Sequence, residues 1–321
     1  MDWSLSRYNE IHQKIGIWYQ EHGRVTLPWR NTDNPYKIYL SEIMLQQTQV
    51  KTVLTRFYFP FLERFPTLKS VAEAPLDDVL KAWEGLGYYT RARNMHKTAQ
   101  QTNGKLPNTA KQLQELSGIG QSTAHAVASF SFGQAVPILD ANVKRILYRF
   151  FALTQRNEKI LWEKAYQLFD YRNAYLYNQA MMDIGSIVCT HRNPQCDLCP
   201  FQRECQGKVN PLKYPEKKVT KKRAIKKHFM LIYSKENRYF LSKNSTKLLG
   251  GLWGFPQVES FNLTKKDKIL GNFTHHYTHF KLDLTVILLK NSSNKNPLFT
   301  IEEIDKLALS GADRKALELL R

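Results

Sequence analysis

The sequence predicts a mainly helical N-terminal part followed by a smaller part that mixes strands and helices. Apolar residues recur at helical spacing up to about residue 205, and nothing in that range is a convincing strand. Residues 211–227 (PLKYPEKKVTKKRAIKK) combine prolines with a dense lysine run, which is typical of a charged linker. Strand-like runs follow. We therefore expect a helical domain over 1–210, a basic linker over 211–227 and an α+β domain over 228–321.

Composition favours a globular protein that meets a polyanion. The chain has 321 residues, 42% hydrophobic residues and a formal net charge of +19, which suits two domains with real cores. Nucleic acid is the leading partner for such a charge, although a surface tuned for solubility also fits. No apolar run is long enough to span a membrane, and the N-terminus lacks the apolar core of a signal peptide. We expect a soluble, intracellular monomer without membrane contact, cytoplasmic if the source is bacterial, and the sequence indicates no protein partner.

The first helices contain a carboxylate in an apolar setting. Helical spacing covers residues 5–22, and Asn34-Pro35 gives a cap followed by proline at the first helical position of a second helix over 36–50. Glu42, Gln46 and Gln49 would share one face of that helix. A glutamate is ordinarily a surface residue, yet Ile43, Met44 and Leu45 surround this one. Partial desolvation would raise the pKa of Glu42, as a general acid near neutral pH requires.

A glycine turn interrupts the next helical patterns. Helices are expected at about 51–64 and 76–84, followed by the turn Gly85-Leu86-Gly87-Tyr88-Tyr89 and a basic helix from Arg91. Aromatic residues beside basic ones at a glycine turn suit insertion into a base stack. Core packing is the alternative and the commoner role of tyrosine.

A second glycine turn, Leu116-Ser117-Gly118-Ile119-Gly120, joins two helical patterns. Gly118 and Gly120 allow positive φ and leave backbone amides unshielded, and such amides at a helix N-terminus form a seat for phosphate. A loop then ends at Asp140, which stands where an N-cap belongs. Further helical patterns lie near 158–171 and 174–188. Taken alone, the glycine turn also fits an ordinary helix hairpin, and Asp140 also fits an ordinary helix N-cap.

All four cysteines fall within one segment, with the spacing C-x6-C-x2-C-x5-C. In a reducing compartment, thiols this close together indicate metal ligation rather than disulfides. Four thiolates suit tetrahedral zinc or a 4Fe–4S cluster. Because there is one short C-x2-C pair instead of two, the spacing favours iron–sulfur. The four ligands would be Cys189, Cys196, Cys199 and Cys205.

The C-terminal part contains strand-like runs at 228–233, 239–242 and 282–289, a Gly250-Gly251 turn and a histidine-rich turn over 275–280. Helical patterns at 301–309 and 312–320 close the chain. The histidines lack acidic or cysteine partners, so contacting or core roles are favoured over metal binding. A nucleotide pyrophosphatase would need a glutamate-rich helix after the Gly-Gly turn, and residues 253–261 offer only Glu259. That activity is excluded.

Together these motifs resemble the helix–hairpin–helix DNA glycosylases, and among them the adenine DNA glycosylases. The resemblance rests on SEIMLQQTQV (41–50), GLGYYTRARN (85–94), LDANV (139–143) and the cysteine spacing. It is dense from about 24 to 205 and sparser beyond, where the chain resembles a Nudix-type domain that reads oxidised guanine. The family pattern identifies the metal group as a 4Fe–4S cluster.

The resemblance implies hydrolysis of the N-glycosidic bond of adenine opposite 8-oxoguanine or guanine in double-stranded DNA. Glu42 would protonate the adenine, Asp140 would stay ionised and stabilise the oxocarbenium-like sugar, and Asn142 would hold this constellation. We expect the amides capped by Asp140 to lower its pKa. The adenine pocket is assigned to Trp29, Arg30 and Asp183, and 8-oxoguanine recognition to Tyr277, Thr278 and His279. The implied DNA contacts are Gln47, Thr48, Tyr88, Gly118, Gly120, Ser122 and Lys144.

Position 122 separates two sister activities. Endonuclease III resembles this chain but has a Schiff-base lysine two residues after the second hairpin glycine, where Ser122 stands here. Without that amine no imine forms, so the sequence favours a monofunctional glycosylase. An endonuclease III-like lyase acting on oxidised pyrimidines and a non-catalytic lesion-binding protein are the alternatives. The chain departs from the family pattern at Ser117, His125 and Ala141, and Thr278 replaces a serine.

Overall fold

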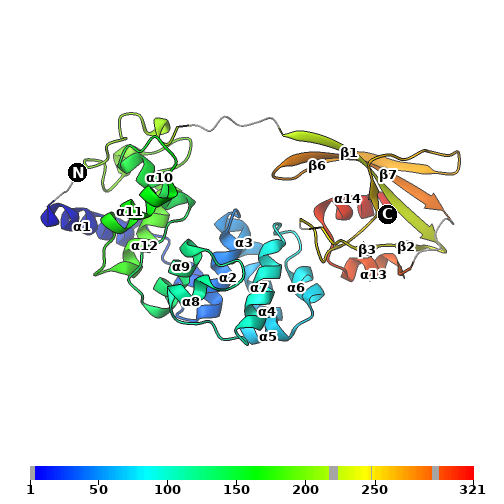
Figure 1. The fold of residues 1–321 in the computed structure, drawn as a ribbon, viewed down its shortest axis with the longest axis horizontal. Helices are drawn as coiled ribbons and strands as arrows, with labels where there is room; N and C mark the ends of the chain where they lie inside the picture. The colour runs from blue at the N-terminus through cyan, green and yellow to red at the C-terminus, as the bar shows by residue number, and fades with distance from the viewer. Residues whose placement is uncertain (1–3, 217–222, 247, 291–295) are drawn as a thin grey trace. The chain divides into compact units, whose positions relative to one another are not determined.

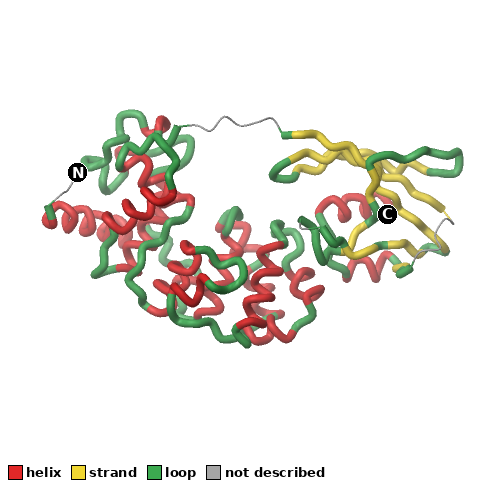
Figure 2. The backbone as a smooth tube through the Cα atoms, viewed as in Figure 1, coloured by secondary structure: helices red, strands yellow, loops and turns green. Residues whose placement is uncertain are grey.

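The computed structural model describes residues 4–216, 223–246, 248–290 and 296–321. Most of the lysine run of the expected linker, residues 217–222, lies outside the described residues. The chain packs as two compact units, Met1–Gln46 with Lys105–Val219 and Gln47–Gly104 with Thr220–Arg321. Figure 2 shows that strands occur only in the C-terminal part of the described chain, which confirms the predicted fold class. The domain boundaries that we expect from composition (1–210, 211–227 and 228–321) remain a prediction.

The first unit is helical. Its core joins α1, α10, α11 and α12 through buried residues such as Ile15, Leu147, Leu168 and Phe150. The elements of this unit are α1 (Leu5–His22), η1 (Pro28–Arg30), α2 (Pro35–Leu45), α8 (Ala110–Gln114), α9 (Gln121–Phe132), α10 (Ala141–Phe150), α11 (Glu158–Leu168), α12 (Ala174–Asp183), the π-helical turn η2 (Ile184–Val188), η3 (Cys196–Leu198) and η4 (Pro211–Lys213).

The second unit combines five short helices with the C-terminal strands. The helices are α3 (Val50–Arg56), α4 (Tyr58–Arg64), α5 (Leu68–Glu73), α6 (Leu76–Ala82) and α7 (Thr90–Gln101). The C-terminal elements are β1 (Ala224–Lys235), β2 (Arg238–Phe240), β3 (Ser242–Lys243), β4 (Trp253–Gly254), β5 (Gln257–Val258), β6 (Lys268–His276), β7 (Phe280–Lys290), β8 (Leu298–Phe299), α13 (Ile301–Lys306) and α14 (Gly311–Leu320).

One sheet organises the C-terminal part, with strand order β6-β7-β1-β2-β8. The long strands β1 and β7 pair in parallel, and β6 pairs antiparallel with β7. Because side chains alternate along a strand, Met230 and Ile232 face a core shared with α13 and α14, while Leu231 faces the opposite side of the sheet. Figure 1 shows both helices beside the sheet.

Several predicted elements are confirmed and several are wrong at their ends. Helix α1 has the predicted bounds. The predicted helix over 36–50 is wrong, because α2 ends at Leu45 and α3 begins at Val50. Gln47 between them has φ of 60°, so Gln46 and Gln49 do not continue the face of Glu42. No glycine or proline signals this break.

Other predicted bounds also change. The pattern over 51–64 divides at Phe57 into α3 and α4, and the pattern over 174–188 becomes α12 followed by the π-helical turn. His275 and His276 belong to β6, so the histidine-rich turn is shorter than predicted. The predicted helix over 301–309 ends at Lys306. Strand β6 was not predicted because its exposed residues lack an apolar alternation.

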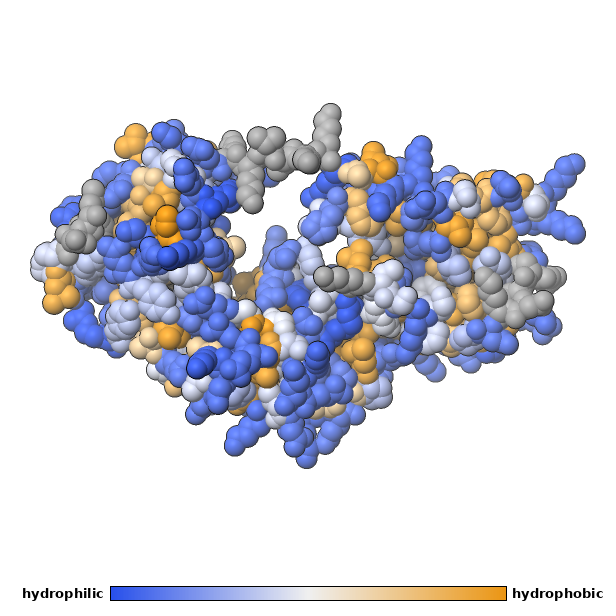
Figure 3. Space-filling view, viewed as in Figure 1, coloured by the Kyte–Doolittle hydropathy of each residue, from blue (hydrophilic) through white to orange (hydrophobic). Residues whose placement is uncertain are grey.

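The surface drawn in Figure 3 is mainly hydrophilic. Among the residues that the structure describes, no helix is long and apolar enough to cross a membrane.

Candidate active site and cysteine loop

Two carboxylates interact in the first unit. Glu42 belongs to α2, between the buried residues Ser41 and Ile43, and Asp140 is the N-cap of α10, as predicted. Both are partly buried. Burial and then the charge of Asp140 raise the pKa of Glu42 to about 7, while Arg30 opposes this shift. The predicted rise in the pKa of Glu42 is therefore present.

Asp140 is held by bonds that favour its ionised form. Its Oδ1 accepts from the backbone amide of Val143 at 2.7 Å, and its Oδ2 accepts from Nδ2 of Asn142 at 3.1 Å. Our expectation of a lowered pKa for Asp140 is wrong, because burial raises it by more than these bonds lower it. The charge of Asp140 contributes to the raised pKa of Glu42, so Glu42 is the carboxyl of this pair that is suited to hold a proton near neutral pH.

Asn142 is hydrogen-bonded to Arg145 as well as to Asp140. Nη2 of Arg145 donates to Oδ1 of Asn142 at 2.9 Å, and its Nε donates to the backbone carbonyl of Cys189 at 2.7 Å. Gly185 in the π-helical turn allows this packing, since a Cβ there would lie 2.6 Å from the Cβ of Asn142. The hydrogen bonds thus run from Asp140 to the start of the cysteine loop.

The loop that leads into Asp140 is fixed by two buried side chains. Asn178 donates to the carbonyl of Val136 at 2.9 Å and accepts from the amide of Ile138 at 3.0 Å. Nδ1 of His125 bonds the carbonyl of Pro137 at 2.7 Å. His125 is therefore accommodated and helps to place the loop that ends at Asp140.

Arg30 and Asp183 form a buried ion pair near Glu42. Arg30 donates twice to Asp183, at 2.6 and 2.8 Å, and Nε of Arg24 adds a bond at 2.8 Å. Burial raises the pKa of Asp183, but these bonds outweigh it and leave the pKa below its ordinary value. Because Asp183 is fully buried and engaged by two arginines, it holds Arg30 in place. Trp29 beside it is also buried.

Two buried polar atoms close to this pair are unsatisfied. Nε of Arg30 and Oε1 of Gln179 have no hydrogen-bond partner among the described residues. Gln179 lies one helical turn before Asp183 on α12. Such buried orphans are rare unless a ligand completes them. Sequence reasoning missed Gln179, Arg24 and Arg145, since no local pattern distinguishes them from other polar residues of these helices and loops.

The predicted hairpin has one positive φ, not two. Gly118 has φ of 74°, whereas Gly120 has φ of −82° and is the N-cap of α9. A Cβ at Gly120 would meet nothing within 4 Å, so the backbone there is open to a close ligand. Ser122 lies in the first turn of α9. Lys144 is on the exposed side of α10 and pairs with Glu158 at 2.6 Å.

The second unit brings two predicted DNA-contacting turns together. Gln47 and Tyr88 both have a left-handed backbone, with φ of 60° and 50°. Arg91 lies between them and donates to the carbonyl of Gly87 at 3.1 Å and to Oγ1 of Thr48 at 3.4 Å. Strained backbone in non-glycine residues tends to concentrate at functional sites.

The turn over 277–279 contacts the 85–89 turn, which contains Tyr88. The hydroxyls of Tyr88 and Thr278 are 3.1 Å apart. Thr278 and His279 are exposed, whereas burial raises the pKa of Tyr277 to about 12 and its ring packs 4.8 Å from that of Phe280. Tyr277 therefore anchors the turn that presents the other two.

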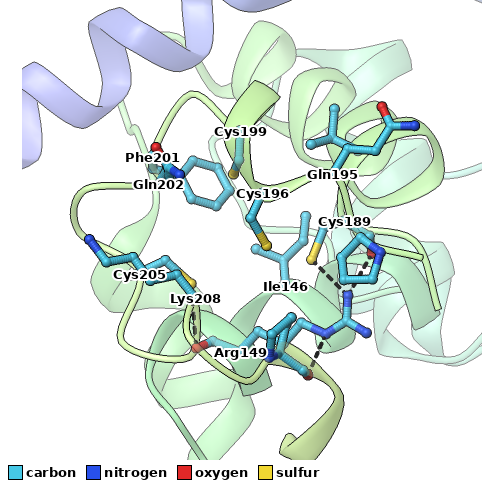
Figure 4. A pocket seen from close by; sticks show the side chains of 13 residues that line it. Ile146, Arg149, Cys189, Gln195, Cys196, Cys199, Phe201, Gln202, Cys205 and Lys208 are labelled. Carbon is cyan, nitrogen blue, oxygen red and sulfur yellow. Dashed lines mark hydrogen bonds between the residues drawn. The ribbon is translucent and has the colours of Figure 1, made fainter. Parts of the chain in front are cut away.

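The four cysteines line one cavity. Figure 4 shows their sulfurs around a common space, with Arg149 at one side. All four thiols are free, and apolar residues such as Ile146, Val188 and Phe201 complete the wall. Burial raises the pKa of Cys199 to about 12 and that of Cys205 to about 11, so a positive centre is needed to keep these groups as thiolates. Within the described residues, no three ligand side chains are gathered tightly enough to hold a single metal ion.

Comparison with known proteins identifies the class. The HhH-GPD superfamily of base excision DNA repair proteins matches residues 40–169, and the NUDIX domain matches residues 228–319. A solved thermostable thymine-DNA glycosylase is 26% identical, with a TM-score of 0.58 over 64% of this chain and 97% of that one. An endonuclease III bound to DNA has a TM-score of 0.55 over 64% of this chain and 98% of that one at 19% identity, which shows a shared fold.

The curated relatives narrow the class further. The adenine DNA glycosylase of Buchnera aphidicola subsp. Baizongia pistaciae is 38% identical over 96% of this chain and 90% of its own length. The enzyme of the same name from Buchnera aphidicola subsp. Schizaphis graminum is 37% identical over 88% of each chain. The human enzyme is 38% identical over 60% of this chain and 38% of its own length. The chain belongs to the adenine DNA glycosylase family.

Proposed function

We propose that the protein is a monofunctional DNA glycosylase that hydrolyses the N-glycosidic bond of adenine opposite 8-oxoguanine, and of adenine opposite guanine, in double-stranded DNA. The observation that carries this proposal is the carboxyl pair, in which burial and Asp140 raise the pKa of Glu42 to about 7. A purine leaves as a neutral base once a ring nitrogen is protonated, and the sugar then becomes cationic. One acid and one anion meet these two needs.

Each carboxyl has a distinct task. Glu42 holds the proton near neutral pH and would donate it to the adenine, after which its carboxylate would help to activate water. Asp140 would remain ionised beside the sugar and stabilise its positive charge. Asn142 orients Asp140 through their 3.1 Å hydrogen bond, which limits motion of the carboxylate during the reaction.

Adenine recognition would use the two buried polar atoms that have no hydrogen-bond partner among the described residues, Nε of Arg30 and Oε1 of Gln179. Adenine offers an amino donor and ring-nitrogen acceptors, which complement Oε1 of Gln179 and Nε of Arg30. Asp183 would act behind them by fixing the guanidinium of Arg30. Trp29 would contribute an apolar wall. The base must leave the stack to reach any such pocket.

Duplex binding would use the turns. The open backbone at Gly120 and the first amides of α9, with Gly118 and Ser122, suit a phosphate. Gln47, Thr48 and Tyr88 would support the distorted duplex, and Lys144 would add a backbone contact. Tyr277, Thr278 and His279 would read the oxidised guanine. Because phosphate contacts release counterions, binding should weaken steeply with added salt.

The cysteine loop would hold a 4Fe–4S cluster through Cys189, Cys196, Cys199 and Cys205. The fit is supported by four thiols around one largely apolar cavity, whose sulfurs surround a common space. Such a cluster would brace the loop that carries Arg192 and Arg203. No step of base release needs it.

The test is single-turnover adenine release from a duplex with adenine opposite 8-oxoguanine, sampled with and without alkali. Strand breaks that appear only after alkali are expected, since Ser122 offers no amine for an imine. Breaks without alkali would instead indicate an endonuclease III-like lyase. Tight binding without any product would indicate a non-catalytic lesion-binding protein.

A further inference from the structure

In the second unit, the C-terminal part is docked on α6 and the turn that follows it. The hydroxyl of Tyr89 donates to the carbonyl of Leu309 at 3.1 Å in a buried contact. Nη1 of Arg93 donates to the carbonyl of Gly250 at 2.7 Å. The segments that carry the 85–89 turn and the 277–279 turn are therefore packed against each other. The Tyr88–Thr278 contact is one of several contacts between them.

One ion pair in this contact region is both forked and partly buried. Arg314, in the first turn of α14, forms a two-point contact with Glu84, with Nε bound to Oε1 and Nη2 to Oε2 at 3.1 Å. Their side chains are only 24% and 17% exposed. Pairs that are partly desolvated and forked are stronger and more directional than exposed ones. This contact can therefore fix geometry.

Backbone carbonyls extend the same contact. Nη2 of Arg314 also donates to the carbonyl of Leu307 at 3.0 Å, and Nζ of Lys81 reaches that carbonyl at 3.1 Å and Glu84 at 2.7 Å. The chain between α13 and α14 is thus tied to the end of α6.

The Glu84–Arg314 pair is connected to both the 85–89 turn and the 277–279 turn. Glu84 immediately precedes Gly85, where the 85–89 turn begins. Arg314 follows Asp313, which is buried, accepts the amide of Phe255 at 3.0 Å and bonds Ser310. Ser310 in turn bonds the side chain of Tyr277, which anchors the 277–279 turn. A shift between Glu84 and Arg314 would therefore move one turn against the other.

We propose that the Glu84–Arg314 pair is a specificity-determining positioning contact, which holds the 277–279 turn against Tyr88 so that both turns meet the base opposite adenine as one unit. This inference rests on the proposed reading of oxidised guanine by that turn. Neither residue is assigned to the chemistry at Glu42 and Asp140. Loss of the pair should reduce the preference for 8-oxoguanine over guanine while leaving bond cleavage itself intact.

The experiment compares Glu84→Gln, Arg314→Met and the double variant in the full-length protein. Single-turnover rates at subsaturating enzyme are measured on duplexes with adenine opposite 8-oxoguanine and opposite guanine, together with thermal unfolding. Each single variant should lower the ratio of the two rates roughly tenfold, because a forked, charge-assisted contact is lost. The double variant should lose clearly less than the sum of the two single losses, since the contact between the two side chains can be removed only once.

A matched control separates specificity from stability. Arg238 and Glu303 form an exposed pair at 2.8 Å within the C-terminal part, so Arg238→Met should leave the ratio unchanged. Additive losses in the double variant, or a lower unfolding temperature with an unchanged ratio, would overturn the inference. A wild-type protein that releases adenine equally from both duplexes would contradict the proposed reading itself and this inference with it. A wild-type preference that both single variants retain would overturn the positioning role alone.

Discussion

The Glu42–Asp140 pair and the Tyr88–Thr278 pair are both made by tertiary folding, yet their surroundings are opposite. The carboxyls are partly buried and their protonation is altered by desolvation and mutual charge. Tyr88 and Thr278 are exposed, and Tyr88 has a strained backbone that neighbouring contacts maintain. In the proposed function, bond cleavage uses carboxyls whose pKa is shifted by partial burial, whereas reading a duplex uses groups that extend from the surface. The carboxyl pair belongs to the first compact unit and the Tyr88–Thr278 pair to the second.

The largest effect should come from removing the proton of Glu42. Glu42→Gln keeps the shape of the side chain but cannot donate, and general acid catalysis contributes roughly 10²- to 10⁴-fold. We expect a loss of about 10³-fold in single-turnover adenine release with lesion binding retained. Glu163→Gln, at an exposed glutamate of α11, should be silent. Full activity of Glu42→Gln would end the proposed mechanism.

Asp140→Asn tests charge apart from capping. Asparagine caps helices about as well as aspartate, so the unfolding temperature should barely change. Base release should fall about 10²-fold because the sugar cation loses its counter-charge. Asn157, which caps α11 through the amides of Lys159 and Ile160, is the matched cap. Asn157→Ala should lower stability by about 1 kcal/mol and leave the chemistry unchanged; an equal loss of activity there would mean that capping alone explains Asp140.

These two carboxyls also show what sequence can and cannot predict. The cap at Asp140 is local chemistry, and the structure confirms it. The sign of its pKa shift depends on burial by distant segments, and there the prediction was wrong. The apolar neighbours of Glu42 revealed its desolvation because they are adjacent in sequence. Arg24 could not be found in this way, since its partner Asp183 is more than a hundred residues away, and Gln179 is notable only because its buried Oε1 has no partner among the described residues.

The same distinction holds for the fold. Helix α1 is predictable from its periodicity and its stop at Gly23. The break after Leu45 is not, because Gln46–Gln49 contains no residue that ends helices. Strand β6 has a mostly polar, exposed pattern and exists because it pairs with β7. The roles of the individual site residues stay predictions until variants are measured.

A stability measurement extends the comparison to folding. The pKa of Glu42 is about 7 in the folded state, whereas an unfolded glutamate titrates near about 4.3. Above pH 7 the folded protein therefore carries an unfavourable charge, and most of that cost disappears as the pH falls toward 4.5, where the carboxyl is protonated in the folded state and partly protonated in the unfolded state. Glu42→Gln should raise the unfolding free energy by about 2 kcal/mol at pH 8, a value reduced for partial exposure, and by little at pH 4.5. Chemical denaturation at both pH values measures this, and an equal difference at the two would contradict the assigned pKa.

The smallest effect is expected at the exposed pair. Thr278→Val keeps the shape of the side chain but removes the hydroxyl that lies 3.1 Å from that of Tyr88. Exposed neutral hydrogen bonds contribute about 0.5–1.5 kcal/mol, so the preference for 8-oxoguanine over guanine should fall roughly threefold. Thr274→Val, at an exposed threonine of β6, is the control. A loss as large as that of Glu42→Gln would mean that the two regions are not separate in function.

The most direct test of the account is the pH dependence of single-turnover adenine release opposite 8-oxoguanine, in the wild type and in Asp140→Asn. If Glu42 is the acid and Asp140 must be ionised, the wild-type rate should fall tenfold per unit above about pH 7 and should fall again at acid pH, where Asp140 becomes protonated. Because the charge of Asp140 raises the pKa of Glu42, the fall in Asp140→Asn should begin at a lower pH. A flat profile between pH 5 and 9, or a midpoint unchanged in Asp140→Asn, would contradict the coupled carboxyl pair.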